Sequence, residues 1–119
     1  MAQAPVIEIS KGVLVILNHL YEIERKLALH GDAGNARRNL ERVKEEFQNT
    51  LMLSYEDPMG QPVKDTRTDL EFSISGPSTS NLVVTEVIKP IIRYGNPEFS
   101  KVVQKGIVVV QGSDGETGQ

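Results

Sequence analysis

The six residues Asp57-Pro58-Met59-Gly60-Gln61-Pro62 divide this 119-residue chain into two parts of different character. Proline and glycine favour a turn here, because proline fixes its own backbone angle and glycine tolerates a positive φ. Before the turn, apolar residues recur every three or four positions, whereas after it they alternate with polar residues. We therefore expect an α+β protein, with a helical hairpin at residues 10–52 and a small, mostly antiparallel β-domain at residues 53–112. Residues 1–9 and 113–119 are predicted to be a flexible N-terminus and a disordered tail.

The first helix is predicted to begin after Ser10, which is a favourable N-cap residue. His30-Gly31 would end it, because glycine suits the position after a helix, and Asp32 would cap the next helix almost at once. Between these limits the apolar residues follow helical steps, at Val13, Ile16, Leu17, Leu20, Ile23 and Leu27.

A second amphipathic helix follows, with apolar residues at Ala33, Ala36, Leu40, Val43, Phe47 and Leu51. The short connection makes the two helices an antiparallel hairpin. Leu14, Tyr21 and Ala28 widen the apolar face of the first helix beyond what one neighbour covers. We therefore expect a homodimer in which two hairpins form a four-helix bundle. The residues expected at that dimer interface are Val13, Leu17, Leu20, Leu40, Val43 and Phe47.

The β-domain is predicted from three stretches of sequence. Leu70, Phe72 and Ile74 alternate with polar residues, as in a half-buried strand. Residues 82–94 have the pattern of a strand interrupted at Pro90, because proline cannot donate to a strand ladder. Residues 102–111 form the last predicted strand, with Gly106 as a β-bulge within it.

Composition argues against several classes of protein. Charged residues make up 24% of the chain and its net charge is −3, so there is no basic excess to neutralise nucleic-acid phosphates. No apolar run approaches the length of about 18–20 residues that crosses a bilayer. Residues 1–11 lack the basic start and apolar centre of a secretory signal, and the absence of cysteine suits a reducing compartment. We expect a cytoplasmic protein with no nucleic-acid partner and no membrane partner.

Candidate catalytic and metal-binding residues are few. His19 and His30 would lie about 16 Å apart along the first helix, so one metal ion cannot bind both. The carboxylates of Asp65, Asp69, Glu71 and Glu86 are scattered, and solvent-facing positions explain them at least as well as an acid–base pair does. No Gly-x-Ser-x-Gly motif and no glycine-rich phosphate loop is present. We expect no enzymatic activity, no metal and no cofactor.

The basic residues of the last predicted hairpin suggest a contact with another protein. Arg93, Lys101 and Lys105 lie near Val108 and Val110, and a basic loop beside exposed valines would suit an acidic partner. Two alternatives stay open: the lysines only keep a solvated edge strand from aggregating, and Val110 belongs to the core. The predicted partner-binding residues are Arg93, Lys101, Val108 and Val110.

Four short motifs, taken in order, resemble motifs of the GrpE family. They are Leu17-Asn18-His19-Leu20, the stretch 57–63, Thr85-Glu86-Val87-Ile88, and Val102-Val103-Gln104 followed by Ile107-Val108-Val109-Val110. The resemblance covers residues 13 to 111. GrpE proteins are co-chaperones that open the nucleotide cleft of DnaK-type chaperones. The resemblance therefore implies a co-chaperone that binds a DnaK-type chaperone through its β-domain and promotes ADP release.

The sequence also departs from the family pattern. The histidine of the family's Asp-Pro-x-x-His-Glu motif is missing from the stretch 65–69. The family's Asn-Gly-Arg hairpin, whose arginine contacts the chaperone, is replaced by Gly95-Asn96-Pro97 and a short insertion, so Arg93 or Lys101 would have to stand in for that arginine. The family's long N-terminal coiled coil has no counterpart before Ser10. A second hypothesis is therefore a GrpE-like homodimeric adaptor or scaffold that binds another protein and lacks exchange activity.

Overall fold

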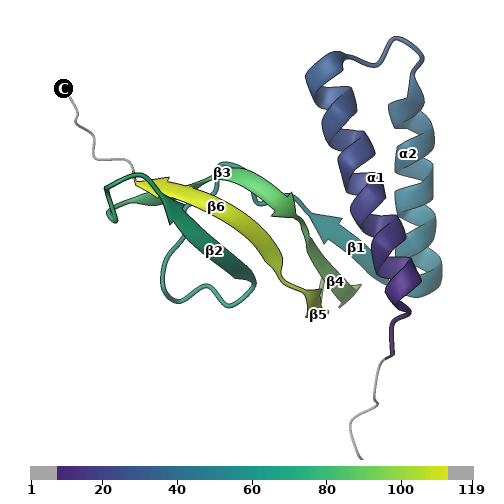
Figure 1. The fold of residues 1–119 in the computed structure, drawn as a ribbon. Helices are drawn as coiled ribbons and strands as arrows, with labels where there is room; N and C mark the ends of the chain where they lie inside the picture. The colour runs from purple at the N-terminus through teal and green to yellow at the C-terminus, as the bar shows by residue number, and fades with distance from the viewer. Residues whose placement is uncertain (1–7, 113–119) are drawn as a thin grey trace, which may run out of the picture.

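The computed structural model describes residues 8–112, which form a helical hairpin and two small β-sheets (Figure 1). The helices are α1 (Lys11–His30) and α2 (Ala36–Glu46), and a π-helical segment, η1 (Phe47–Leu51), continues α2. The strands are β1 (Leu53–Glu56), β2 (Leu70–Ser75), β3 (Leu82–Lys89), β4 (Ile91–Asn96), β5 (Phe99–Gln104) and β6 (Gly106–Gly112). The α+β class and the change from helix to strand after residue 52 agree with the prediction. The predicted disordered tail and most of the predicted flexible N-terminus lie outside the described residues.

The local signals that predicted the ends of α1 are confirmed, whereas α2 begins at Ala36, after a turn that contains Ala33. Ser10 Oγ accepts a hydrogen bond of 3.2 Å from a backbone N–H in the first turn of α1. Gly31 adopts a φ of 95° after the last turn, and its N–H donates to the carbonyl oxygen of Leu27. The carboxylate of Asp32 accepts bonds of 2.6 and 2.9 Å from the first two backbone N–H groups of α2. The hairpin is therefore closed by the residues whose chemistry predicted it.

The second helix changes its winding before it ends. Its α-helical bonds stop at Glu46, η1 continues as a π-helix, and Met52 ends it with a φ of 57°. This geometry lets the side-chain amide of Gln48 donate to the carbonyl oxygen of Gly95 at 2.8 Å. The N–H of Gly95 in turn donates to the carbonyl oxygen of Met52, also at 2.8 Å. The end of the helical hairpin is thus bonded to β4.

The strands form two sheets, with the orders β1-β4-β5 and β2-β6-β3 (Figure 1). The first sheet is antiparallel throughout. In the second sheet the central strand β6 runs parallel to β2 and antiparallel to β3. The prediction of a small, mostly antiparallel β-domain is therefore confirmed.

The chain passes from one sheet to the other at Pro90 and again before Gly106. Pro90 separates β3 from β4, so the stretch 82–94 is two strands in different sheets. The prediction of a bulge at Gly106 is wrong, because this residue pairs in register with Leu70 at the start of β6. A Cβ atom on Gly106 would lie 2.8 Å from the side chain of Leu70 and 2.9 Å from that of Ile91. Glycine is needed at this crossing because no side chain fits.

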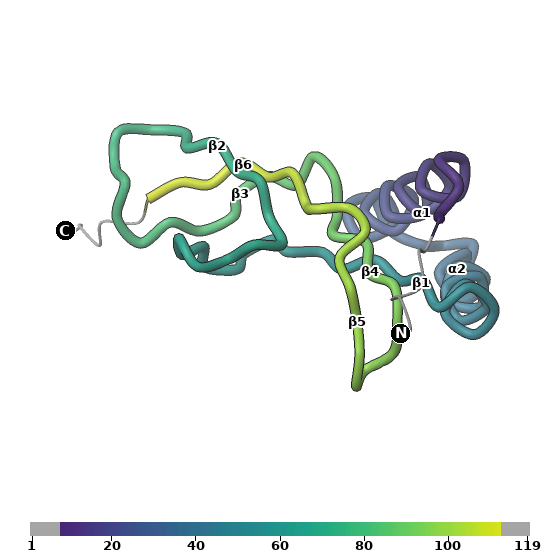
Figure 2. The backbone as a smooth tube through the Cα atoms, turned by 90° about the horizontal axis from the view of Figure 1, so that it is seen from below, coloured from purple at the N-terminus to yellow at the C-terminus, as the bar shows by residue number. Residues whose placement is uncertain are grey.

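The helical hairpin packs against the sheet β1-β4-β5. Leu17 of α1, Leu53 of β1 and Ile92 of β4 form one buried cluster. A second buried cluster lies against the sheet β2-β6-β3, and Tyr21 of α1 belongs to it. Figure 2 shows the helices beside β1 and the second sheet reaching away from them. The Cα radius of gyration is 16.8 Å, above the value of about 13 Å for a compact domain of 100 residues. The molecule is therefore more extended than a compact domain of similar length.

Candidate functional site

Two of the predicted partner-binding residues, Val108 and Val110, are buried in the core. Their exposed fractions are 1% and 0%, so the expectation that they face a partner is wrong. The physical reason is that β6 is the central strand of its sheet, and the loop carrying Val63 covers the same face. The alternative that Val110 belongs to the core is the correct one.

Arg93 lies in a network of ion pairs that joins three segments. Its Nε donates to Glu56 of β1 at 2.9 Å, and a terminal nitrogen donates to Asp69 at 2.9 Å. Arg67 binds the same Asp69 carboxylate through two hydrogen bonds, of 2.9 and 3.0 Å. The hydrogen bonds from Arg67 hold the pKa of Asp69 below its ordinary value, and the Arg93 charge acts in the same direction. The guanidinium of Arg93 is therefore committed to contacts within the chain.

The hairpin of β4 and β5 carries the other predicted partner-binding residue, Lys101, in an exposed position. The side chain of Asn96 accepts hydrogen bonds from the N–H groups of Glu98 and Phe99, at 3.0 and 2.9 Å, and so fixes the turn. Phe99 is 61% exposed, and Figure 2 shows this hairpin projecting from the molecule. Phe99 and Lys101 lie two residues apart and so share one face of β5. The sequence prediction missed Phe99, although it is the one apolar side chain in the polar stretch 95–101.

The predicted dimerisation residues divide into three groups. Leu17 and Leu40 are buried within a single chain, so they are not available to a second copy. Val13, Leu20 and Phe47 are half-buried and pack against the cluster under β1-β4-β5. Val43 is 40% exposed. Two further apolar residues, both on α1, are also exposed: Ile16 by 50% and Ile23 by 47%. Part of the apolar face that suggested a dimer is thus covered by the chain's own sheet, and part is not.

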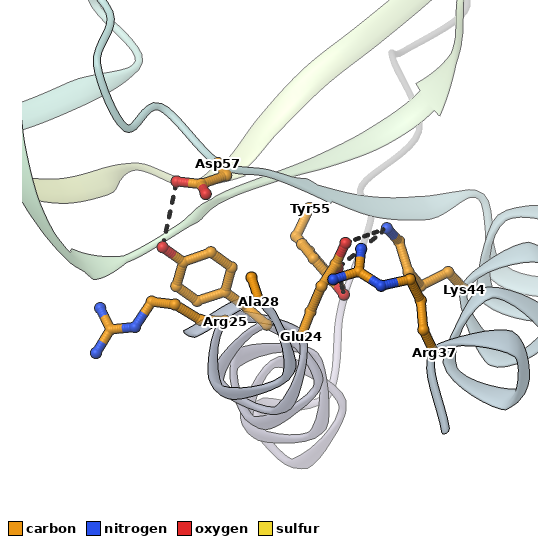
Figure 3. Close-up of a pocket in the computed structure, with 8 residues that line it drawn as sticks. Glu24, Arg25, Ala28, Arg37, Lys44, Tyr55 and Asp57 are labelled. Carbon is orange, nitrogen blue, oxygen red and sulfur yellow. Dashed lines mark hydrogen bonds and ion pairs between the residues drawn. The ribbon is translucent and has the colours of Figure 1, made fainter. Parts of the chain in front are cut away.

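A cleft of about 220 Å³ lies where the helices meet β1 (Figure 3). Its lining residues come from α1, α2 and the chain around β1: Tyr21, Glu24, Arg25, Ala28, Arg37, Lys44, Tyr55 and Asp57. The hydroxyl of Tyr55 donates to Glu24 at 2.6 Å, and Lys44 Nζ donates to the same oxygen at 3.2 Å. The ammonium of Lys44 also lies 5.0 Å from the centre of the Tyr55 ring, within cation–π range. Glu24 thus joins α1 to both α2 and β1.

A second tyrosine closes the other side of the cleft. The hydroxyl of Tyr21 donates to Asp57 at 3.2 Å, and the same carboxylate oxygen accepts the backbone N–H of Met59. The rings of Tyr21 and Tyr55 meet edge to face, with centroids 6.0 Å apart. Two phenol–carboxylate bonds therefore fasten α1 to β1 and to the turn after it.

Both phenols of the cleft are held in the protonated form. Burial, reinforced by the charge of Asp57, raises the pKa of Tyr21 to about 12. Burial and the hydrogen bond to Glu24 also raise the pKa of Tyr55. Burial alone would raise the pKa of Glu24, but hydrogen bonds from Tyr55 and Lys44 outweigh it and hold this pKa below its ordinary value. The tyrosines therefore act as hydrogen-bond donors at neutral pH.

Arg25, which lies beside Tyr21, connects α1 to the second sheet. A terminal nitrogen of Arg25 donates to the carbonyl oxygen of Val87 in β3 at 3.1 Å, while the other lies 3.6 Å from Glu22. Two turns earlier on the same face of α1, the side chains of Asn18 and Gln104 exchange two hydrogen bonds, of 3.1 and 2.9 Å. The helical hairpin is therefore bonded to both sheets, and the hairpin β4–β5 projects from a rigidly mounted β-domain.

Within residues 8–112, no group of three or more His, Asp or Glu side chains is placed to hold a metal ion. Neither helix in this part of the chain is long and apolar enough to cross a membrane. No known protein family, curated protein or solved structure matches the chain significantly.

Proposed function

We propose that this chain is a GrpE-like co-chaperone, which binds a DnaK-type chaperone through its β-domain and promotes ADP release. The observation that carries this proposal is the arrangement itself: a helical hairpin fixed rigidly to a β-domain that presents a projecting hairpin. The four motifs that resemble the GrpE family fall on these elements in the same order. Exchange of this kind requires preferential binding to the open form of the chaperone's nucleotide cleft, and no catalytic side chain is needed for it.

The helical hairpin would make the protein a homodimer. Ile16 and Ile23 lie seven residues apart on one face of α1, and Val43 is exposed on α2. Covering this apolar surface with the same surface of a second copy would produce the four-helix bundle of the proposal. The Ile23→Glu substitution would place a carboxylate in that interface, so sedimentation velocity should show a monomer where the wild type is a dimer. Dimers of unchanged affinity in the Ile23→Glu variant would contradict this part of the proposal.

The contact with the chaperone would centre on the tip of the hairpin β4–β5. Phe99 offers a large apolar group in a fixed turn, and Lys101 adds a positive charge on the same face. Phenylalanine is among the residues enriched at protein interfaces, and a neighbouring charge favours a partner of complementary charge. Arg93 would support the base of this hairpin through Glu56 and Asp69 and would not reach the partner.

Stopped-flow release of labelled ADP from a cognate chaperone tests the function directly. The wild-type chain should accelerate release, and Lys101→Glu should weaken the acceleration at subsaturating concentration by about tenfold, the loss of roughly 1.4 kcal/mol of binding free energy. Lys64→Glu, which changes another exposed lysine outside the hairpin, is the matched control. No acceleration at saturating wild-type protein would exclude the exchange function.

A GrpE-like adaptor without exchange activity is the second candidate. The observation that favours it is the commitment of Arg93 to intramolecular ion pairs, which leaves the hairpin without a free arginine. Recovery of a different protein without any chaperone in a pull-down from native lysate, together with no change in the rate of ADP release, would support this candidate over the first.

A further inference from the structure

The strand β2 lies at an open edge of its sheet. It pairs with β6 on one side, and within residues 8–112 no backbone hydrogen bond joins its other side to any segment. Figure 1 shows β2 along one edge of its sheet, with β6 between it and β3. Open edges template pairing with other strands, and proteins usually block them with charged side chains, especially lysine, or with proline, a bulge or a covering loop. The β2 sequence Leu70-Glu71-Phe72-Ser73-Ile74-Ser75 contains no lysine and no proline, and Glu71 is its one charged residue.

The opposite edge of the same sheet is covered. The segment 60–63 runs along β3 and makes three backbone hydrogen bonds with it: Gly60 N–H to Val84, Val84 N–H to Gln61, and Val63 N–H to Leu82. Pro62 forms an isolated bridge with Val83 in the same place. The loop that follows β1 therefore protects β3 and leaves β2 unprotected. The difference between the two edges of one sheet marks β2 as the place where a further strand fits.

The direction of the free backbone groups on β2 follows from its pairing with β6. The N–H of Gly106 donates to the carbonyl oxygen of Asp69, and Leu70 is opposite Gly106 in this parallel ladder. The backbone groups of the odd-numbered residues therefore point to β6, since bonding groups alternate along a strand. Those of Leu70, Phe72 and Ile74 point outwards.

We propose that β2 pairs antiparallel with β2 of a second copy of this chain, centred on Phe72. In this register Phe72 lies opposite Phe72 of the second copy, and Leu70 lies opposite its Ile74. All three outward-pointing residues then form hydrogen-bonded pairs. The two three-stranded sheets join into one continuous sheet, with their core faces on the same side.

The side chains suit this pairing. Phe72 and Ile74 belong to the face that packs on the core, yet they are 38% and 43% exposed because they lie at its edge. Self-pairing would bring them against the same residues of the second copy, and aromatic and branched cross-strand pairs stabilise sheets. The one charge of the strand, Glu71, lies opposite Ser73 of the second copy, so the register avoids a like-charge pair. This contact goes beyond the proposed function and is separate from the helical surface with Ile16 and Ile23.

Sedimentation velocity in the Ile23→Glu background tests the pairing, because that variant removes the helical contact. The Ile23→Glu variant should form a dimer as its concentration rises, and adding Ile74→Pro should leave a monomer. Proline removes the outward N–H of residue 74 and keeps the ladder to β6, whereas Ile74→Ala keeps the N–H and is the matched control. A monomer at every concentration without Ile74→Pro would overturn the proposal. Equal weakening of the dimer by Ile74→Pro and by Ile74→Ala would also overturn the proposal, because such a result would show that the backbone N–H at the edge of β2 is not used.

Amide hydrogen exchange provides a readout that side-chain burial alone would not change. The amides of Phe72 and Ile74 should become protected as concentration rises, whereas those of Glu71 and Ser73, bonded to β6, should be protected throughout. Persistent protection of Glu71 and Ser73 in the Ile74→Pro variant would show that the strand is still folded. Absence of concentration-dependent protection at Phe72 and Ile74 in the wild type would refute the pairing.

Discussion

Tyr55 connects α1, α2 and β1 to one another. Its hydroxyl donates to Glu24 of α1, its ring lies under the ammonium of Lys44 of α2, and its backbone belongs to β1. Tyr55→Phe keeps the ring and removes only the hydrogen bond to a carboxylate. We expect a loss of about 1.5–3 kcal/mol in the free energy of unfolding, the usual contribution of a bond to a charged group. Urea denaturation measures it, with Tyr94→Phe as the control, since the Tyr94 hydroxyl makes no hydrogen bond within residues 8–112.

Asp69 should make the stability of the protein depend on acidity. Hydrogen bonds from Arg67 lower the pKa of Asp69 in the folded chain. As the pH falls, the Asp69 carboxylate of the unfolded chain therefore takes up a proton before that of the folded chain does. The stabilisation is therefore complete above the unfolded pKa, about 3.9, and is lost as the pH falls through the lower folded value. Asp69→Asn should remove this part of the acid dependence and should cost stability at neutral pH. Urea denaturation at a series of pH values would test this, and a stability profile of Asp69→Asn identical to that of the wild type would contradict the prediction.

At the scale of elements, the hairpin β4–β5 depends on one glycine. Gly95 has a φ of 131°, and a Cβ atom there would overlap the Phe99 carbonyl oxygen and lie 2.8 Å from the Cα of Ser100. Gly95→Ala should therefore separate the two strands and cost at least about 1–3 kcal/mol. Gly34→Ala, with open space around it and no positive φ, should instead stabilise the fold by up to about 1 kcal/mol. Thermal unfolding compares the two, and a Gly95→Ala protein as stable as the wild type would contradict the prediction.

The elements differ in how far their sequence predicts them. The ends of α1 follow from Ser10 and Gly31 because capping is local chemistry between a side chain and its own helix terminus. The assignment of β3 and β4 to different sheets does not follow from residues 82–94, because packing against segments far away in the sequence decides it. The same holds for Val110: the continuous apolar run 107–110 does not show which face of the strand is buried, and the loop with Val63 covers the face that carries Val110. The π-helical winding of η1 and the exposed Phe99 tip likewise depend on how the hairpin β4–β5 meets the helices.

At the scale of the whole molecule, the helical hairpin and the β-domain should unfold together. Leu17 of α1 is 1% exposed in a cluster with Leu53 and Ile92, so the two parts share one core. Leu17→Ala should therefore cost about 2–5 kcal/mol, as large-to-small changes in a core do, and should destabilise the sheets as much as the helices. Far-UV circular dichroism would follow the helices, and amide exchange of Ile92 would follow β4. Leu29→Ala, at a position that is 70% exposed near the end of the same helix, should change neither signal appreciably. If the helices of the Leu17→Ala variant melted before Ile92 lost its protection, the two parts would be independent, and a helical dimer could not hold the projecting hairpin rigidly against a chaperone.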